Sequence, residues 1–205
     1  MPFLLVAAFL VTAVLYASVG FGGGSTYSAL LVLNGTDYRI LPAIALVCNI
    51  IVVSGGIWRF SRTGHLSLRR LTPFLVTSIP MAWLGGRLLI SETVFIGMLG
   101  AALLLSGLRL VMENAPPQDD TAITEPRHLA SGITGAGIGL LSGLVGIGGG
   151  IFLAPVLYMM KWGGARQIAA ACSLFILVNS LSGLVGQVMK LQGTFVLHPI
   201  GLCLW

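Results

Sequence analysis

Gly20-Phe-Gly-Gly-Gly24 and Gly146-Ile-Gly-Gly-Gly150 are two nearly identical glycine clusters, 126 residues apart, and they decide the fold predicted for this chain. Each cluster lies inside a long apolar run, residues 3–33 and 129–160. A straight helix needs only about 20 apolar residues to cross a bilayer, and adjacent glycines are poor helix residues. We therefore predict that each run contains a helix that breaks at the glycines and restarts after them.

The composition predicts an integral membrane protein of the all-α class, a polytopic helical bundle. Of the 205 residues, 56% are hydrophobic and only 8% are charged, which is too few polar side chains to cover a water-soluble fold. The charges divide the chain into six apolar stretches, each long enough to cross a bilayer. These stretches are residues 3–33, 40–58, 71–90, 93–112, 129–160 and 165–189.

Several function classes find no support in the residues. The net charge of +5 is scattered over loops without interleaved aromatics, so we expect no nucleic-acid partner. We expect no metal, no cofactor and no catalytic residues, hence no enzyme, because the histidines share no ligand spacing and no nucleophile lies near a base. The cysteines are read as small packing residues. The residues concerned are His65, His128, His198, Cys48, Cys172 and Cys203.

Basic residues predict the orientation in the membrane. The densest cluster is Arg59, Arg62, Arg69 and Arg70, which we place in the cytoplasm by the positive-inside rule. If every apolar stretch crosses once and a turn follows around Lys190, seven basic residues including Lys190 lie inside. Four lie outside, namely Arg39, Arg87, Lys161 and Arg166. The first copy of a repeat would then hold four helices, and the two copies would be parallel, whereas an odd number of crossings would invert them.

The chain is interpreted as two copies of one unit. The shift that relates the glycine clusters also relates Leu71-Thr72-Pro73 to Leu197-His198-Pro199. We predict a first transmembrane repeat at 1–112, a polar linker at 113–128 and a second, incomplete repeat at 129–205. The second copy stops eleven residues into its third apolar stretch, at Trp205, which leads us to expect a fragment or truncated chain.

The broken helices predict a substrate site. A helix that restarts after glycines presents unpaired N–H groups and the positive end of its dipole, which suits an anion, and paired broken helices in two repeats are typical of transporter sites. Alternatively, the glycines serve close helix packing, as we infer for Gly135, Gly139, Gly143, Ala13 and Ala17. The candidate substrate-binding residues are Gly22, Gly23, Gly24, Gly148, Gly149, Gly150, Asn49, Asn179 and Arg87.

The three polar candidates each have a second interpretation. Asn49 and Asn179 are paired by the repeat, because residues 49–56 resemble residues 179–186. Both lie within apolar stretches, where an amide binds a substrate oxygen or ties two helices together. We expect both to be the polar side chains nearest to the breaks. Arg87 lies near a helix end, where it either extends to the interface or faces a cavity and attracts the anion.

The glycine motifs resemble the duplicated signature of the sulfite exporter TauE/SafE family. The resemblance rests on Gly20–Gly24 and on Ser142–Gly150 followed by Pro155, and it covers nearly the whole chain. Ala169-x-x-Cys-Ser-Leu174 is similar to that family's Ala-x-x-Thr-Ser-Leu, with Cys172 in place of threonine. The resemblance implies a bacterial inner-membrane permease of about eight helices, whose members move sulfite and other sulfur-containing anions.

The sequence thus favours a secondary permease for a small anion, sulfite or an organosulfur anion such as a sulfonate, in a bacterial inner membrane that the chain crosses several times. The expected partners are the small anionic substrate and the lipid bilayer. No sequence feature indicates an oligomeric state. The alternative is a non-transporting membrane component that binds a partner through its loops.

Overall fold

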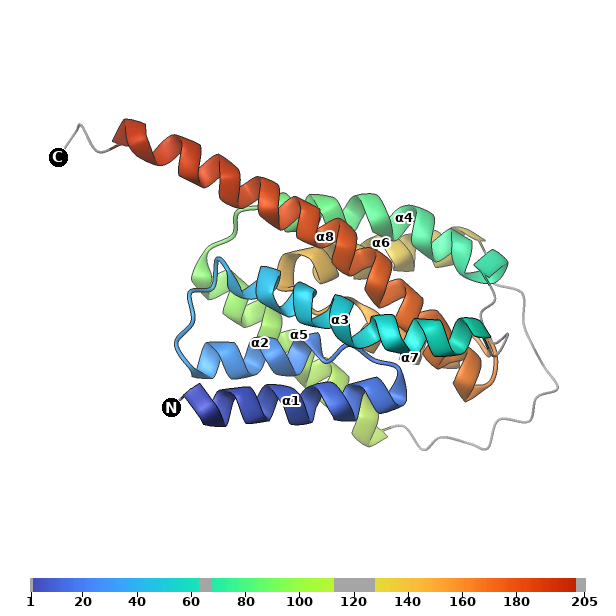
Figure 1. The fold of residues 1–205 in the computed structure, drawn as a ribbon. Coiled ribbons are helices and arrows are strands. Elements are labelled where there is room, and N and C mark those ends of the chain that lie inside the picture. Colours follow the sequence, from blue (N-terminus) through green and yellow to red (C-terminus); the bar gives the residue numbers. More distant parts are fainter. Residues whose placement is uncertain (1, 63–67, 113–127, 202–205) are drawn as a thin grey trace.

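Helices account for all the regular structure in the part of the chain that the computed structural model describes, residues 2–62, 68–112 and 128–201. Figure 1 shows their arrangement. The predicted all-α class is confirmed. The helices are α1 (Pro2–Val19), α2 (Gly24–Leu33), α3 (Leu41–Arg62), α4 (Leu68–Arg87), α5 (Glu92–Met112), α6 (His128–Val145), α7 (Gly150–Met159) and α8 (Ala165–Gly201).

The length of two helices and the apolar side chains on the surface make this bundle a membrane fold. Two helical segments, Leu41–Arg62 and Ala165–Lys190, are long and apolar enough to cross a membrane by length and composition. Large apolar side chains also lie exposed along α1, where Phe3 is 89% exposed and Val14 is 62% exposed. A helix that is apolar on its exposed face suits lipid rather than water. The predicted all-α membrane bundle is therefore confirmed.

Both glycine clusters interrupt a helix, as predicted. Residues 20–23 separate α1 from α2, and residues 146–149 separate α6 from α7. Gly23 and Gly149, directly before the new helices, both have φ of 77°, a left-handed conformation that glycine adopts without a steric penalty. The last glycine of each cluster begins the following helix, so each break starts earlier than its three consecutive glycines.

Each break reverses the chain, which the sequence analysis did not anticipate. α2 runs back along α1, and the Tyr16 hydroxyl lies 2.9 Å from the Thr26 hydroxyl across this hairpin; Figure 1 shows the two helices side by side. α7 returns along α6 in the same way, and Leu153 shares an apolar cluster with Ile138. The two long apolar runs therefore form hairpins instead of crossing once, because left-handed glycines at the start and end of each break, Gly20 and Gly23 or Gly146 and Gly149, turn the backbone around.

Glycines of α6 form a seam with α4. Gly135, Gly139 and Gly143 each face the backbone of α4 so closely that a Cβ atom would clash with it. Backbones can approach this closely only where the side chains between them are missing. The packing interpretation of these three glycines is confirmed. Their counterparts in α1 do not pack in this way, since Ala17 is exposed and Ala13 is only half-buried.

The contacts also determine the direction of the helices. Leu46, near the start of α3, lies 3.4 Å from a Cβ position on Gly183, well along α8. Phe60, near the end of α3, and Ser173, early in α8, both contact Gly20. α3 and α8 are therefore antiparallel, although they follow equivalent breaks. The two copies are inverted and not parallel, because each break adds a returning helix that the sequence analysis did not count.

The hairpins also change how basic residues divide between the two ends of the bundle. The guanidinium carbon of Arg70 lies 5.0 Å from the centre of the Trp162 ring, so the α7–α8 loop lies at the same end as the start of α4. Among residues whose side chains the structure describes, that end holds Arg59, Arg62, Arg69, Arg70, Lys161 and Arg166. The other end holds Arg39, Arg87 and Lys190. Lys161, Arg166 and Lys190 thus lie at the ends opposite to those expected.

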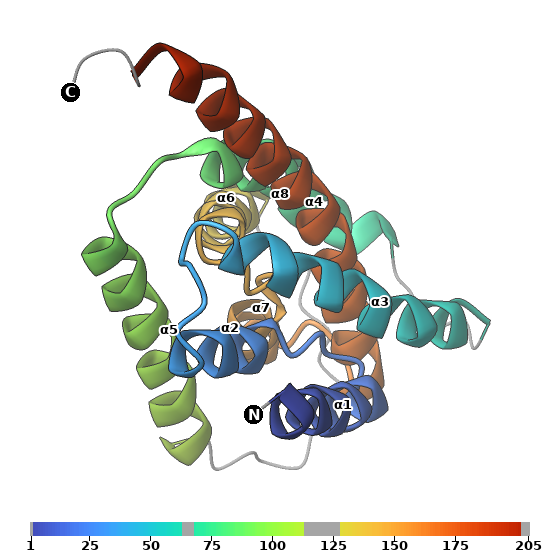
Figure 2. The ribbon, with the colours of Figure 1, turned by 60° about the vertical axis from the view of Figure 1, so that its left-hand side comes forward.

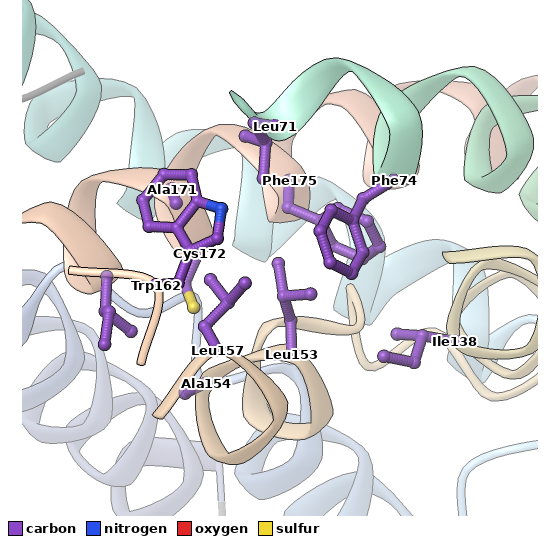
Figure 3. Close-up of a cluster of buried hydrophobic side chains, with 11 residues drawn as sticks. Leu71, Phe74, Ile138, Leu153, Ala154, Leu157, Trp162, Ala171, Cys172 and Phe175 are labelled. Atoms are coloured by element: carbon purple, nitrogen blue, oxygen red, sulfur yellow. The ribbon is translucent and has the colours of Figure 1, made fainter. Parts of the chain in front are cut away.

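The apolar core joins α4 to the helices of the second copy. Figure 3 shows Leu71 and Phe74 of α4 facing Phe175 of α8 and Leu153 of α7. Trp162, which is 1% exposed, closes this cluster from the α7–α8 loop. Figure 2 shows the same arrangement from another side, with α4, α6 and α8 adjacent. This core holds the second break against the centre of the bundle.

Two features of the predicted organisation concern the ends of the repeats. α8 continues unbroken through Lys190, where a turn was expected, since Lys190-Leu-Gln are good helix formers. In Figure 1 its C-terminal part extends beyond the other helices. The predicted linker 113–128 lies outside the described residues except for His128, which begins α6, and Cys203 also lies outside them. The domain boundaries stay a prediction.

Candidate functional site

The starts of α2 and α7 carry backbone N–H groups without acceptors. Within the described residues, no hydrogen bond leaves the N–H groups of residues 22–26, and none leaves those of residues 147–151. The first turn of any helix lacks internal acceptors, and the helix dipole adds positive potential there. Glycines 22–24 and 148–150 are all buried, so no bulk water lies beside them. Each break is therefore a buried row of donors.

The two breaks lie against each other, although 126 residues separate them in the sequence. A Cβ atom placed on Gly24 would lie 2.9 Å from the carbonyl oxygen of Gly146 and 2.9 Å from that of Ile147. Only a glycine at the start of α2 allows this approach. The break between α1 and α2 is therefore in direct contact with the break between α6 and α7.

Asn49 of α3 connects the two breaks. Its side chain is 0% exposed, and its Nδ2 donates to the carbonyl oxygen of Gly146 at 3.3 Å. The same amide contacts Gly22 and Gly24 of the first break, and it lies 2.8 Å from a Cβ position on Gly148 of the second. Its Oδ1 has no hydrogen-bond partner among the described residues. Asn49 thus presents a buried, half-satisfied amide to both rows of donors.

Two serines of α8, which the sequence analysis did not single out, also reach the breaks. The Ser173 hydroxyl donates to the carbonyl oxygen of Gly20, and it also lies 2.8 Å from the carbonyl oxygen of Ala169 in its own helix. Ser180 is fully buried, its Oγ has no partner among the described residues, and it lies 3.3 Å from a Cβ position on Gly148. The available signal for Ser173 was its place in the motif at 169–174.

Asn179 and Arg87 lie elsewhere. Asn179 is buried, but its Nδ2 donates to Phe175 one turn back in its own helix at 2.9 Å. It is not among the nearest atoms at any glycine of the breaks. Arg87 is exposed at the end of α4, with its guanidinium carbon 4.7 Å from the centre of the Trp83 ring. The structure therefore brings together the six glycines and Asn49, and it leaves these two residues outside that group.

Acidic side chains of the described residues occur away from the breaks. Asp37 and Glu92 line a cavity of about 380 Å³ at one end of the bundle, together with Arg39 and Tyr38. The Tyr38 hydroxyl, 3.4 Å from Nε of Arg39, raises the pKa of Arg39 above its ordinary value, so this residue stays cationic. No group of three potential metal ligands occurs in the part of the chain that the structure describes. The nearest atoms at the glycines of the breaks all belong to uncharged groups.

The fold and this site define an α-helical membrane protein with paired, opposed broken helices, an arrangement typical of transporters. The family model described as sulfite exporter TauE/SafE matches residues 4–204. The probable membrane transporter protein y4hK of Sinorhizobium fredii (strain NBRC 101917 / NGR234) is 38% identical over 186 residues, which cover 89% of this chain and 74% of that protein. No solved structure shows a significant match.

The chain therefore belongs to the sulfite exporter TauE/SafE family, as its glycine motifs indicated. The family and this relative identify it as a membrane transporter. The resemblance found in the sequence is confirmed over nearly the whole chain. The substrate and the roles of the individual site residues stay predictions.

Proposed function

We propose that the chain is a secondary transporter that carries a small anion, sulfite or an organosulfur anion such as a sulfonate, across a bacterial inner membrane without catalysing a reaction. The observation that carries this proposal is that the two breaks lie against each other, and that the N–H groups at residues 22–26 and 147–151 have no acceptor among the described residues. Unpaired backbone donors at buried helix starts stabilise negative charge and disfavour cations. The family's description as sulfite exporters supports the choice of anion.

The groups beside the breaks are uncharged, which suits a transporter because it must release its anion again. A buried lysine or arginine beside the breaks would bind an anion more tightly and slow its release. Backbone N–H groups with the Asn49 amide supply several weaker hydrogen bonds, each to a charged acceptor worth about 1.5–3 kcal/mol. In this proposal the breaks separate slightly to admit the anion, and α3 and α8 carry the facing side chains.

The distribution of basic residues supports an orientation for this transporter. Six described basic side chains lie at the end that includes Arg59 and Arg70, against three at the end that includes Arg39. We place the richer end in the cytoplasm, following the positive-inside rule. The chain then crosses the membrane several times, with α1 beginning outside.

Flux measured in proteoliposomes tests the proposal. Purified protein reconstituted into vesicles should carry labelled sulfite or methanesulfonate at rates well above those of protein-free vesicles, and it should not carry sodium or methylammonium. Inserted, folded protein without flux of any tested anion would contradict the proposal and favour the non-transporting membrane component. Protease cleavage at Arg59–Arg70 from the vesicle side that corresponds to the cytoplasm reports the orientation.

A further inference from the structure

We propose that Ile176 of α8 selects the substrate by giving the second break an apolar wall where the first break has the Asn49 amide. The site would then accept an anion that carries a short apolar group, with its charged group at the start of α2 and its apolar group toward the start of α7. This inference rests on the proposed anion transport and deepens it.

Ile176 holds the place that corresponds to Asn49 in the inverted copy. Asn49 lies nearest to Gly22 and Gly24 of its own break and reaches Gly148 of the other break. Ile176 lies nearest to Gly150 and Gly148 of its own break, 2.8 Å from a Cβ position on Gly148, and it reaches Gly22 of the other break at 3.1 Å. The two side chains are therefore counterparts in space. Asn179, which the sequence paired with Asn49, is not.

Other neighbours of the breaks follow the same division. A Cβ position on Gly23 in the first break lies 3.1 Å from the Tyr16 ring and 3.2 Å from the methyl group of Thr12. The corresponding position on Gly149 in the second break lies 2.8 Å from Ile138 and 2.9 Å from the Phe175 ring. The side chains nearest to Gly23 thus carry hydroxyl groups, whereas those nearest to Gly149 are apolar. The hydroxyl-bearing neighbours of the second break, Ser142 and Ser180, lie farther away, at 3.4 Å from a Cβ position on Gly149 and 3.3 Å from one on Gly148.

The Asn49 amide supports the first break as the place for the charge. The Nδ2 atom of Asn49 is buried and carries two N–H groups, and its one hydrogen bond among the described residues is to the Gly146 carbonyl oxygen, so the second N–H can donate to an anion. Burying an unsatisfied amide is costly, so a ligand that pairs with it recovers that cost. Ile176 offers no such group to the N–H row at the start of α7.

An apolar wall changes selectivity in a measurable way. Removing an alkyl group from water increases affinity by about fourfold per methylene. A fully inorganic oxyanion has no group that profits from Ile176. Along a series of methane-, ethane- and propanesulfonate, the wild-type protein should therefore bind progressively more tightly, by up to about fourfold per step, until the space at the wall is filled.

Substitution at Ile176 tests the inference with the reconstituted full chain. Ile176→Asn should flatten the sulfonate series to less than about twofold per step and improve the flux of sulfite relative to propanesulfonate by about tenfold. Ile176→Val, the matched control, keeps the apolar wall and should keep the rising series. Ile176→Thr is a smaller polar change, and it replaces Ile176→Asn in the test if that variant does not fold. It should also flatten the sulfonate series.

The exchange of both residues provides the decisive comparison. Asn49→Ile alone should abolish most of the anion flux. The double variant Asn49→Ile with Ile176→Asn again has one amide beside the two breaks, so it should recover at least part of the flux. If the wild-type protein carries the anions, but neither Ile176→Asn nor Ile176→Thr changes its sulfonate series, the inference is wrong and the proposed anion transport still holds. A wild-type protein that carries none of the anions would overturn the proposed function itself.

Discussion

The two glycine breaks share a backbone design and differ in their surroundings. Each places a left-handed glycine, Gly23 or Gly149 with φ of 77°, directly before a helix of 10 residues. The Asn49 amide lies nearest to the first break and Ile176 nearest to the second. The hydroxyl-bearing Tyr16 and Thr12 surround Gly23, whereas Ile138 and Phe175 lie nearest to Gly149, with Ser142 and Ser180 farther away. Backbone geometry is therefore duplicated while side-chain chemistry is not. A duplicated fold can thus keep its donors in both halves and bind a substrate in one orientation.

The sharpest test of this comparison is Gly24→Ala against Gly150→Ala. The new Cβ of Gly24→Ala would lie 2.9 Å from the Gly146 carbonyl oxygen, which cannot move away easily. The new Cβ of Gly150→Ala would clash with the side chain of Ile176 at Cγ1 and Cδ1, and its nearest backbone atom would be the Cys172 carbonyl oxygen at 3.6 Å, an ordinary contact. We expect Gly24→Ala to cost about 2 kcal/mol of stability and to reduce flux at least about tenfold. Gly150→Ala should cost less than about 1 kcal/mol.

Thermal unfolding in detergent and flux in vesicles measure the two effects. Gly55→Ala is the matched control, because a Cβ atom at this helical position of α3 meets nothing within 4 Å. That substitution should be neutral or stabilising by about 0.5–1 kcal/mol. Equal losses for Gly24→Ala and Gly150→Ala would contradict the asymmetry between the breaks.

The two buried asparagines should also differ. Asn49→Leu removes the amide that contacts both breaks, so the KM for the anion should rise by about 10–100-fold, the value of a hydrogen bond to a charged group. Asn179→Leu removes a bond within α8 and should change KM by less than about twofold. Concentration dependence of initial flux gives both constants. A similar rise for both variants would return Asn179 to the site.

Ser173 should stabilise the first break without binding substrate. Its hydroxyl donates to the Gly20 carbonyl oxygen and lies between two helices, so Ser173→Ala should lower the free energy of unfolding by about 1 kcal/mol with KM unchanged. Ser54→Ala is the control, because the Ser54 hydroxyl is exposed and bonds only within α3, to Ile50 at 2.5 Å. Thermal melts of the two variants measure the difference, and identical midpoints would count against this role.

Arg87→Gln should have the smallest effect. Arg87 is exposed and stacks on Trp83 at the end of α4, and no contact connects it with the breaks among the described residues. We expect less than about a twofold decrease in flux, and less still at high ionic strength, because salt screens an exposed charge. Flux titrations at low and high salt measure this. A loss of tenfold or more would show that the anion depends on a side-chain cation as well as on the backbone.

The sequence predicted the breaks because glycine clustering is a local property. Three adjacent glycines inside an apolar run disfavour a continuous helix whatever surrounds them, and the helices do stop before residues 20 and 146. The packing role of Gly135, Gly139 and Gly143 followed from their spacing along one helix face in the same way. The family was likewise visible in these motifs.

The sequence was less informative wherever two distant segments had to be placed relative to each other. Hydropathy measures the length of an apolar run but not whether the chain turns back within it, so the hairpins and the inverted copies were missed. Sequence alignment also paired Asn49 with Asn179, three residues beyond its counterpart Ile176. Three residues correspond to most of a helical turn, and this moves a side chain to a different face.

Taken by itself, the sequence determined the membrane environment, the helical class, the positions of the breaks and the family. These four features depend on composition and on short motifs. Composition and motifs act through the local conformational preferences of the backbone and through the transfer of apolar side chains out of water. Only the tertiary structure decided that the chain reverses at each break, that Gly24 meets Gly146, and that Asn49 and Ile176 face both breaks. Such contacts depend on how helices pack across the bundle, where a few ångströms or part of a turn decide which atoms meet.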